Sequence, residues 1–256
     1  MLIRAHGTAV ARERYRRDGR ARGARNTRRY SRDIPSGVIY FILMTAHPTP
    51  PRFWDRRAAA YAKQPIRDEA AYAQTLDRVR AHLTPSDRVL EIGCGTGTTA
   101  LALAANAGHI LATDYSAEMI GIAAGKARAA GVTNVEFRTT TLDDPALTPG
   151  SFDVVMAMNF LHLVGDVAET IRRIRRLVRA GGIFVSKTPC VGEQGLLLRV
   201  AIPVMRAVGV APFVSFVTER GLVEDIGGAG FELIETGMYP RKARSFFVVA
   251  KRPAAA

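Results

Sequence analysis

The chain contains 256 residues, of which 48% are hydrophobic, and carries a formal net charge of +13. This length suits one good-sized domain with appendages, and no apolar run reaches the length that a membrane-spanning helix needs. Its two cysteines, Cys94 and Cys190, stand far apart and outside any C-x-x-C or His/Cys cluster. We therefore expect no disulfide framework, no metal site, and a reducing, cytoplasmic location.

The positive charge is concentrated at the start of the chain. Residues 1–43 hold eleven arginines and three acidic residues, a net charge of +8, so the remaining 213 residues carry only +5. Three interpretations of this segment are open. It is a basic tail that binds nucleic acid or an anionic surface, or a targeting peptide, or a stretch that precedes the native start. We favour a start at Met44, which leaves residues 44–256 as the domain, and we expect residues 1–43 to be disordered.

An aromatic segment and a helix come before the first predicted strand. Residues 53–62 include Trp54 and Tyr61, Pro65 follows, and a helix is expected from about 68 to 82. Each of the two aromatic side chains either anchors this segment against the domain or faces a ligand.

The most informative stretch is a strand that breaks into three alternating glycines. Residues 89–92 read as a buried strand, and Gly93, Gly95 and Gly97 read as the turn after it. A glycine turn that opens a helix lets a ligand lie against bare backbone near the partly positive helix end. Asp114 ends the next strand, where an acid can accept hydrogen bonds from both hydroxyls of a ribose. Together these features predict a site for an adenosine-containing cofactor.

The later elements follow in the order of an open α/β sheet. Strands are expected at residues 135–138, 151–158, 183–187, 231–235 and 246–250, and a helix at 166–179. Asp166 is the expected N-cap of that helix, with Glu169 three positions later as in a capping box. The helix has apolar residues at helical spacing, so its arginines fall on a solvated outer face and do not indicate nucleic-acid binding.

The glycine spacing decides which cofactor is expected. The nicotinamide fingerprint is G-x-G-x-x-G, whereas this chain reads E-x-G-x-G-x-G from Glu91 to Gly97. That pattern resembles the first motif of the class I S-adenosylmethionine-dependent methyltransferases. The stretches S-F-D-V-V from residue 151 and V-R-A-G-G from residue 178 resemble that family's fourth strand and the turn before its fifth.

The resemblance covers roughly residues 52–252 and implies both a fold and a cofactor. The fold is an α/β, Rossmann-like, doubly wound sheet of seven strands, mostly parallel with an antiparallel last strand, with helices on both faces and a small helical cap. The cofactor is S-adenosyl-L-methionine.

The resemblance also implies the residues of the cofactor site. The glycine turn would pack beside the methionine moiety, and Asp114 would hold the ribose. Relatives often show G-D-A after the third strand, where the acid holds the adenine amino group; here the Thr141 hydroxyl or Asp143 is left for that contact. The implied cofactor-binding residues are Glu91, Gly93, Cys94, Gly95, Gly97, Asp114, Tyr115, Met119, Thr141, Leu142, Asp143 and Asn159.

Two cap segments, residues 52–84 and 189–217, lie outside the minimal cofactor-binding core and are expected to choose the substrate. The first resembles the N-terminal cap of small-molecule methyltransferases. Tyr61 is therefore the candidate to close on the cofactor or substrate, with packing against the core as the alternative. Trp54 is expected to anchor the cap.

The second cap segment is very apolar. Pro203 is expected to interrupt any long helix in it, and Arg199 and Arg206, seven residues apart, are expected to share one outer face. We favour a buried cap helix. The alternatives are a lid over an apolar acceptor and peripheral docking of residues 195–217 on a membrane surface.

Methyl transfer from a sulfonium is an in-line displacement, so positioning supplies much of the acceleration, and a base is needed only if the acceptor must lose a proton. His162, just after the fourth strand, is the candidate base; alternatively it packs or caps a turn. Asn159-Phe160-Leu161-His162 stands where an N-P-P-Y-like motif would be, and neither cysteine is placed as a base-methylating nucleophile. Methylation of nucleic-acid bases or protein glutamine is therefore disfavoured.

The sequence thus predicts an enzyme, an S-adenosylmethionine-dependent methyltransferase with a small, apolar or aromatic acceptor and no nucleic-acid partner. One alternative is an RNA methyltransferase that uses the basic N-terminal tail. Another is a protein that binds the cofactor without turnover. A nicotinamide dehydrogenase is disfavoured by the glycine spacing.

Overall fold

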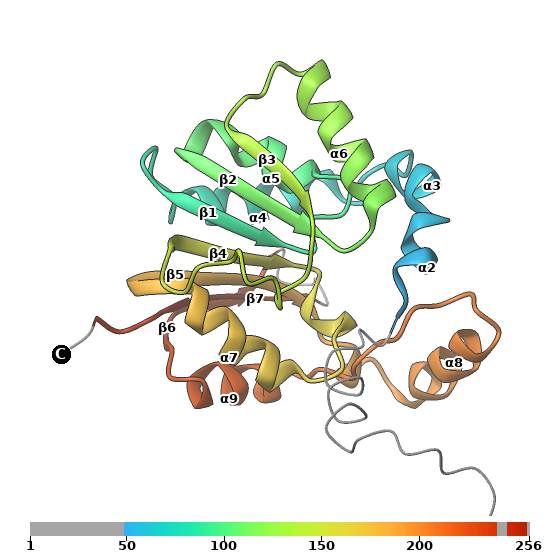
Figure 1. Ribbon diagram of the computed structural model, residues 1–256. Helices are drawn as coiled ribbons and strands as arrows, with labels where there is room; N and C mark the ends of the chain where they lie inside the picture. The colour runs from blue at the N-terminus through green and yellow to red at the C-terminus, as the bar shows by residue number, and fades with distance from the viewer. Residues whose placement is uncertain (1–48, 240–244, 255–256) are drawn as a thin grey trace, which may run out of the picture. The chain divides into compact units, whose positions relative to one another are not determined.

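The computed structural model of the protein describes residues 49–239 and 245–254 (Figure 1). The expectations for residues 1–43 therefore fall outside the described part of the chain. Among the described residues, no helix has the length and apolar character of a membrane span, and no group of histidine, cysteine and acidic side chains could hold a metal ion.

The centre of the fold is one seven-stranded sheet. Its strands are β1 (Arg88–Ile92), β2 (His109–Asp114), β3 (Val135–Thr139), β4 (Phe152–Met158), β5 (Val178–Pro189), β6 (Glu232–Met238) and β7 (Ser245–Lys251). Across the sheet they run β3-β2-β1-β4-β5-β7-β6, and every pairing is parallel except the two that β7 makes. The predicted Rossmann-like sheet with an antiparallel last strand is confirmed.

Helices cover both faces of this sheet (Figure 1). The helices α4 (Glu69–Arg80), α5 (Thr98–Leu103) and α6 (Ala117–Ala129) lie on one face, and α7 (Val167–Leu177) and α9 (Glu219–Gly228) lie on the other. Neighbouring residues of β1 point to opposite faces of the sheet. Val89 packs against the face covered by α4, α5 and α6, and Leu90 packs against the face covered by α7 and α9. Both side chains are fully buried, which is why this strand reads as a continuous apolar run.

The fifth strand begins earlier than the sequence suggests. Val178 already pairs with Phe152, and after a register shift Ile183 pairs with Val154. The glycines at 181 and 182, expected as a turn before the strand, lie inside it. A Cβ at Gly182 would lie 2.7 Å from the Asp153 carbonyl oxygen, so the close approach of the two strands accounts for this glycine.

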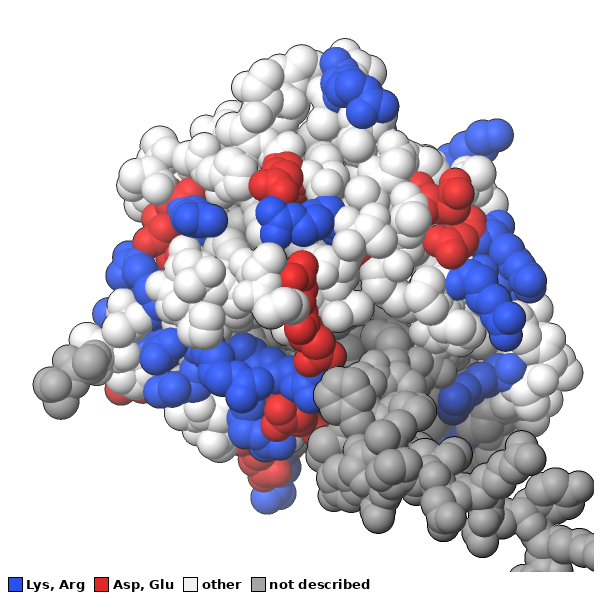
Figure 2. Space-filling view, viewed as in Figure 1, with Lys and Arg blue, Asp and Glu red and all other residues white. Residues whose placement is uncertain are grey.

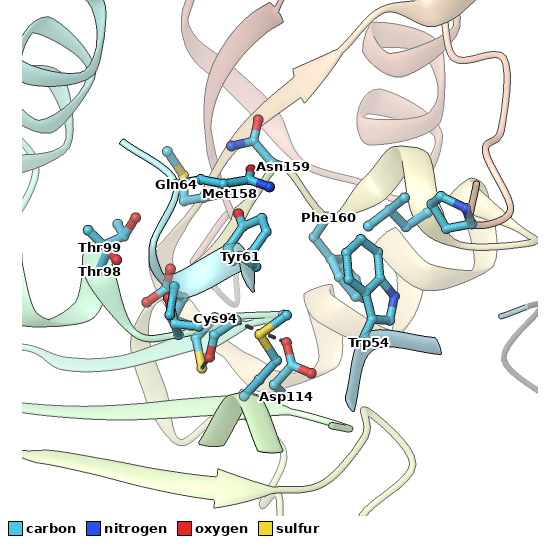
Figure 3. Close-up of a pocket in the computed structure, with 18 of the residues that line it drawn as sticks. Trp54, Tyr61, Gln64, Cys94, Thr98, Thr99, Asp114, Met158, Asn159 and Phe160 are labelled. Atoms are coloured by element: carbon cyan, nitrogen blue, oxygen red, sulfur yellow. Dashed lines mark hydrogen bonds between the residues drawn. The ribbon is translucent and has the colours of Figure 1, made fainter. Parts of the chain in front are cut away.

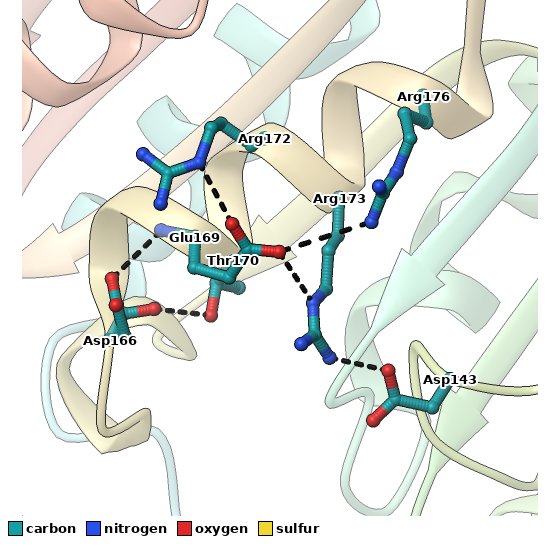
Figure 4. A network of polar contacts seen from close by, with 7 residues as sticks. All are labelled: Asp143, Asp166, Glu169, Thr170, Arg172, Arg173 and Arg176. Atoms are coloured by element: carbon teal, nitrogen blue, oxygen red, sulfur yellow. Dashed lines mark hydrogen bonds and ion pairs between the residues drawn. The ribbon is translucent and has the colours of Figure 1, made fainter. Parts of the chain in front are cut away.

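Asp166 caps α7 as predicted, because its carboxylate accepts a hydrogen bond from the Glu169 amide at 2.8 Å. The reciprocal half of a capping box is replaced by ion pairs. The Glu169 carboxylate binds Arg172 at 2.8 Å and Arg173 at 3.1 Å on the next turn of the helix (Figure 4).

The cap consists of α2 (Pro51–Asp55), α3 (Ala58–Ala62) and the segment that carries α8 (Leu196–Ala207). The two parts meet at Arg57, whose guanidinium donates hydrogen bonds to the Gly209 and Val210 carbonyls at 3.1 and 3.4 Å. The Phe213 amide also donates to the Thr49 hydroxyl at 2.8 Å. The cap is therefore joined mainly by polar contacts to backbone groups.

Two expectations about α8 are wrong. Pro203 lies inside the helix without interrupting it, since a proline removes only one hydrogen bond of the helix and this residue is exposed. Arg199 and Arg206 are both exposed, as expected, and their guanidinium carbons lie 5.9 and 4.8 Å from the ring centroids of Phe216 and Phe213. None of the side chains described in this helix is buried, and its most covered residues are Leu198, Ala201 and Ile202.

The helix is consequently not the buried cap helix that the apolar sequence favours. Much of its exposed surface is apolar. The exposed fractions are 82% for Leu197, 60% for Val200, 59% for Val204 and 70% for Val208.

Candidate active site

A cavity of about 570 Å³ lies between the carboxyl ends of β1, β2 and β4 and the cap (Figure 3). Because β1 lies between β2 and β4, the chain order reverses at this point, and open α/β sheets bind their ligands at such a place. The volume is in the range of small-molecule sites. The predicted site residues that line it are Tyr61, Glu91, Gly93, Cys94, Gly95, Asp114, Tyr115, Met119, Asn159 and His162.

The glycine turn after β1 forms one wall of the cavity. Gly93, Gly95 and Gly97 all have positive φ angles, of 67°, 54° and 75°. The outer two are also required by packing: a Cβ at Gly93 would lie 2.5 Å from the Phe160 ring, and one at Gly97 would lie 2.7 Å from the Phe137 ring. At Gly95 the nearest atom would be a Tyr61 ring carbon 3.9 Å away, so the central glycine leaves open space above bare backbone.

Asp114, the last residue of β2, is bound to this turn. Its Oδ2 accepts a hydrogen bond from the Gly95 amide at 3.0 Å, and its Oδ1 accepts one from the Ser116 amide at 2.9 Å. Burial raises the pKa of this carboxyl, while those amide hydrogen bonds partly oppose the shift. Each oxygen can accept a further bond, so the fixed carboxylate suits two neighbouring hydroxyls.

Glu91 supplies a second acid at the end of β1. Its side chain is buried, and its Oε2 has no hydrogen-bond partner among the described residues. Burial raises the pKa of this carboxyl to about 8, and the charge of Asp114 adds to the shift. A backbone hydrogen bond from Ala100 partly opposes this shift. A buried carboxyl with one free oxygen next to a second acid favours a cationic ligand, because a positive charge would stabilise the ionised form.

Tyr61 of α3 faces these groups from the cap (Figure 3). The side chain is 48% exposed, yet burial at the cavity raises the pKa of its phenol, and the charge of Asp114 adds to this effect. Trp54, expected only as an anchor, also lines the cavity. Aromatic rings from α2 and α3 therefore form the wall opposite the glycine turn.

Asn159 and His162 follow β4. Asn159 is the one non-glycine residue with a positive φ, 54°, among those the structure describes, which reflects the sharp turn that ends the strand. Burial lowers the pKa of His162 to about 4, and its Nδ1 is buried without a hydrogen-bond partner among the described residues. The imidazole is thus neutral at physiological pH and available as a hydrogen-bond acceptor, but it is a weak base.

Four predicted site residues do not line the cavity: Gly97, Thr141, Leu142 and Asp143. Gly97 caps α5 from the position behind the turn. Asp143 forms an ion pair with Arg173 of α7 (Figure 4). A contact between this carboxylate and an adenine would require that pair to open.

Sequence reasoning missed several residues of the cavity. Some follow predicted motifs directly and could have been found by extending them: Thr98 and Thr99 after the glycine turn, and Met158 and Phe160 around the end of β4. Others depend on chain segments that meet only in the folded structure: Gln64, Ile66, Tyr72, Pro189, Pro212 and Val214.

Comparisons with known proteins agree with this geometry. The model of a methyltransferase domain family matches residues 83–205. The uncharacterized methyltransferase YcgJ of Bacillus subtilis is 31% identical over 123 residues, which are 46% of this chain and 49% of YcgJ. This chain thus spans about half of that relative. The ubiquinone biosynthesis O-methyltransferase of Agrobacterium fabrum is 29% identical over 185 residues, covering 66% of this chain and 74% of that protein.

Among solved structures, geranyl diphosphate C-methyltransferase from Streptomyces coelicolor, in complex with S-adenosyl-L-homocysteine, superposes with a TM-score of 0.59. It is 15% identical, with 72% of this chain and 79% of that chain covered, so the likeness concerns the fold. The matching methyltransferase domain at residues 83–205, the methyltransferase relatives and the shared fold together support a class I S-adenosylmethionine-dependent methyltransferase.

These comparisons support S-adenosylmethionine as the cofactor, and the cavity is suited to it. The cofactor carries a sulfonium, an ammonium and a ribose. The buried Glu91 carboxyl, whose Oε2 has no partner among the described residues, complements positive charge, and Asp114 presents two fixed oxygens for ribose hydroxyls.

Proposed function

We propose that this enzyme transfers the methyl group of S-adenosylmethionine to a small, apolar or aromatic acceptor that carries no phosphate or carboxylate. The observation that carries the proposal is the composition of the cavity wall. Of the described residues that line it, none is lysine or arginine, and the charged side chains are the two acids Glu91 and Asp114. An anionic acceptor would meet negative charge without a cation to offset it.

The wall opposite the acids is aromatic and apolar. It combines Trp54 and Tyr61 from the cap, Phe160 and Leu163 after β4, and Pro212 and Val214 after α8. A wall of this kind recognises a flat or hydrocarbon ligand by burying its surface. Two similar proteins are named as a ubiquinone biosynthesis O-methyltransferase and a geranyl diphosphate C-methyltransferase, which supports a small organic acceptor. The diphosphate of the latter has no cationic partner in this cavity.

The bound cofactor would supply a methyl carbon that its sulfonium already activates, so the main task of the protein is to align the acceptor with that carbon. We assign the cofactor to the glycine turn, Cys94, Glu91 and Asp114, with Tyr115 and Met119 beside its nucleoside. Tyr61 would close over the reacting groups. For the adenine we assign the stretch at Thr141 and Leu142 rather than Asp143, because Asp143 is paired with Arg173.

His162 lines the cavity, and we assign its neutral imidazole to a hydrogen bond with an acceptor hydroxyl. With a pKa of about 4, it would orient a phenol or enol better than it would deprotonate one. The plot of kcat/KM against pH should then show no fall in activity on the acid side near pH 6.5. A fall near pH 6.5 that disappears in His162→Gln would instead identify His162 as the general base.

The test uses the full chain. Calorimetry should show binding of S-adenosylmethionine and S-adenosylhomocysteine but not of NAD. Transfer of a labelled methyl group is then measured for pairs of acceptors, such as a phenol against the same phenol carrying a phosphate. We expect transfer to the neutral member of each pair. Preference for the phosphorylated member would refute the proposed acceptor class, and cofactor binding without transfer to any acceptor would indicate a protein without turnover.

A further inference from the structure

The helix α8 exposes more apolar surface than an ordinary surface helix. Such a helix buries its apolar face and exposes its charges. Here Leu198, Ala201 and Ile202 are partly buried, and a further set of apolar side chains is exposed to solvent together with Arg199 and Arg206. Six of the ten large hydrophobic side chains found exposed in the described residues lie between 197 and 210. They are Leu197, Val200, Val204, Met205, Val208 and Val210.

The exposed set forms a continuous stripe. Leu197, Val200, Val204 and Val208 follow each other at spacings of three, four and four, so they lie on one side of the helix. A contiguous apolar surface of this kind marks a contact with another apolar phase or protein. Because the helix contributes no buried residue to the core of the domain, exposure of this stripe is not a by-product of core packing.

The segment that carries α8 projects from a fixed base. The Gly192 amide donates to the Val217 carbonyl at 2.9 Å, and the Ser215 amide donates to the His162 carbonyl at 2.8 Å. Between these bonds, Gly195 and Gly209 flank the helix with φ angles of 92° and 74° and open space around both. The helix is therefore held outside the domain by a base that borders the cavity, since Pro212 and Val214 line it.

The charged residues next to the apolar stripe indicate what kind of partner it contacts. No acidic residue occurs between 195 and 217. The neighbouring α2–α3 segment adds three exposed cations, Arg52, Arg56 and Lys63, and its one acid, Asp55, accepts a hydrogen bond from the Ser116 hydroxyl at 2.6 Å. Figure 2 shows basic side chains on this side of the molecule, above the α8 region, with a group of acidic side chains beside them.

We propose that α8 docks with its apolar stripe in the surface of an anionic phospholipid bilayer, with the cations of α2 and α3 against the headgroups. Apolar side chains beside arginine and lysine are the pattern that partitions into such an interface. A second copy of the chain is a poorer match, because a two-fold contact through this face would bring the same cations together. Docking would place the cap side of the cavity next to the phase in which an apolar acceptor dissolves, a consequence that rests on the proposed function.

The first test is co-sedimentation of the full chain with vesicles of phosphatidylcholine alone and of phosphatidylcholine with an equal part of phosphatidylglycerol. We expect binding to the anionic vesicles that weakens as salt is added, because salt screens the headgroup attraction. The double variant Leu197→Glu/Val204→Glu should reduce that binding at least about tenfold, since it removes apolar contact and adds repulsion. Both positions are exposed, so the fold is not at risk.

A matched control keeps charge and composition equal. Leu233→Glu/Ile234→Glu makes the same kind of change on β6, where the two side chains are 41% and 50% exposed and lie far from the cap in the sequence. This variant should bind anionic vesicles like the unchanged chain. Equal loss of binding in both variants would attribute the effect to net charge and overturn the role of α8.

Three further outcomes would overturn the proposal. One is that the folded chain binds neither kind of vesicle. Another is self-association, measured by sedimentation velocity, that Leu197→Glu/Val204→Glu abolishes while vesicle binding is absent, which would make the stripe a contact between copies. The last is binding that is lost when the eleven arginines of residues 1–43 become glutamine but unaffected by the α8 variant. Calorimetry with S-adenosylmethionine on the same samples tests the cofactor site separately from docking.

Discussion

The two sides of the cavity are built in different ways. The cofactor side consists of strand ends and a glycine turn, and the strand that leads into it, β1, is buried at four of its five residues. On the cap side, α2 and α8 contain no buried residue, and α3 contains only Ala58. Glu91 and Asp114 are thus positioned by the core, whereas Trp54 and Tyr61 lie on short helices that pack against α6 and are bonded to its start by the Asp55–Ser116 hydrogen bond.

This difference indicates that the two sides of the cavity have different roles. Groups on a rigid sheet can hold fixed hydrogen-bond geometry, and elements with few buried contacts open at little free-energy cost. We therefore expect substitutions on the sheet side to change cofactor affinity or stability. Substitutions on the cap side should change turnover and acceptor choice.

The largest effect is expected at Asp114. Asp114→Ala should weaken S-adenosylmethionine binding about 100-fold or more, because two hydrogen bonds to a carboxylate, each worth roughly 1.5–3 kcal/mol, are lost. Calorimetry measures this directly. Asp143→Ala is the matched control, since its carboxylate pairs with Arg173 and does not line the cavity; a loss of less than about threefold is expected. An equal loss in the two variants would move the decisive carboxylate contact to Asp143.

Next in size is a contrast between two glycines of the same turn. Gly97→Ala should lower the free energy of unfolding by about 2–4 kcal/mol, because a Cβ there would meet Phe137 at 2.7 Å and Ala123 at 2.8 Å and because φ is 75°. Gly95→Ala faces no such clash and should cost about 1–2 kcal/mol from its positive φ. Denaturant unfolding of both variants checks the contrast. If they are equally destabilised, packing behind the turn is not what requires Gly97.

A smaller effect is expected from the ionisation of Glu91. Its pKa of about 8 in the free protein means that the carboxyl carries a proton at neutral pH, and the cationic cofactor must displace it. Affinity should therefore rise about tenfold per pH unit up to about pH 8 and level off above it. Calorimetry near pH 7 in two buffers of different ionisation enthalpy should report the release of nearly one proton. Glu91→Gln should remove both the slope and the release.

The raised pKa of Glu91 also makes the free energy of unfolding of the cofactor-free protein depend on pH. The folded pKa lies above the ordinary value of 4.5, so the folded state binds the proton more tightly than the unfolded state. The contribution is fully present below pH 4.5 and is lost as the pH rises toward 8. Melting temperatures of the unchanged chain and Glu91→Gln should thus diverge over this range. Parallel curves would contradict the assigned pKa.

The smallest effect on the cofactor is expected from the cap. Tyr61→Ala should lower kcat/KM for the acceptor about tenfold while changing cofactor affinity less than about threefold, because the ring lies opposite the glycine turn without bonding to it. Tyr61→Phe should behave nearly like the unchanged enzyme. If Tyr61→Phe loses as much turnover as Tyr61→Ala, the hydroxyl rather than the ring contributes to the reaction.

The sheet side of the molecule could be predicted from local sequence. Apolar runs that end in glycine turns or acids specify buried parallel strands, and residues at their carboxyl ends must converge on one edge of the sheet. For this reason the sequence pattern alone identifies Glu91, Gly95, Asp114 and Asn159 as neighbours at that edge. The seven-stranded fold likewise follows from the order of the elements along the chain.

The cap could not be predicted in the same way. Helical periodicity shows which side chains between 195 and 208 share a face, but not which face turns inward. The apolar residues on one side, Leu198 and Ile202, are partly buried, whereas Leu197 and Val204 on another side are exposed. The pairing of Asp143 with Arg173 likewise joins groups thirty residues apart, and no local pattern marks it.

The sequence by itself thus determined the sheet, the glycine turn and the class of cofactor, because these depend on apolar patterning and on backbone conformations that only glycine adopts readily. The tertiary structure alone decided that the cavity wall of described residues lacks lysine and arginine, that His162 is neutral, and that α8 presents apolar side chains to solvent. These properties arise from burial and from contacts between segments distant in the chain, which no stretch of residues contains within itself.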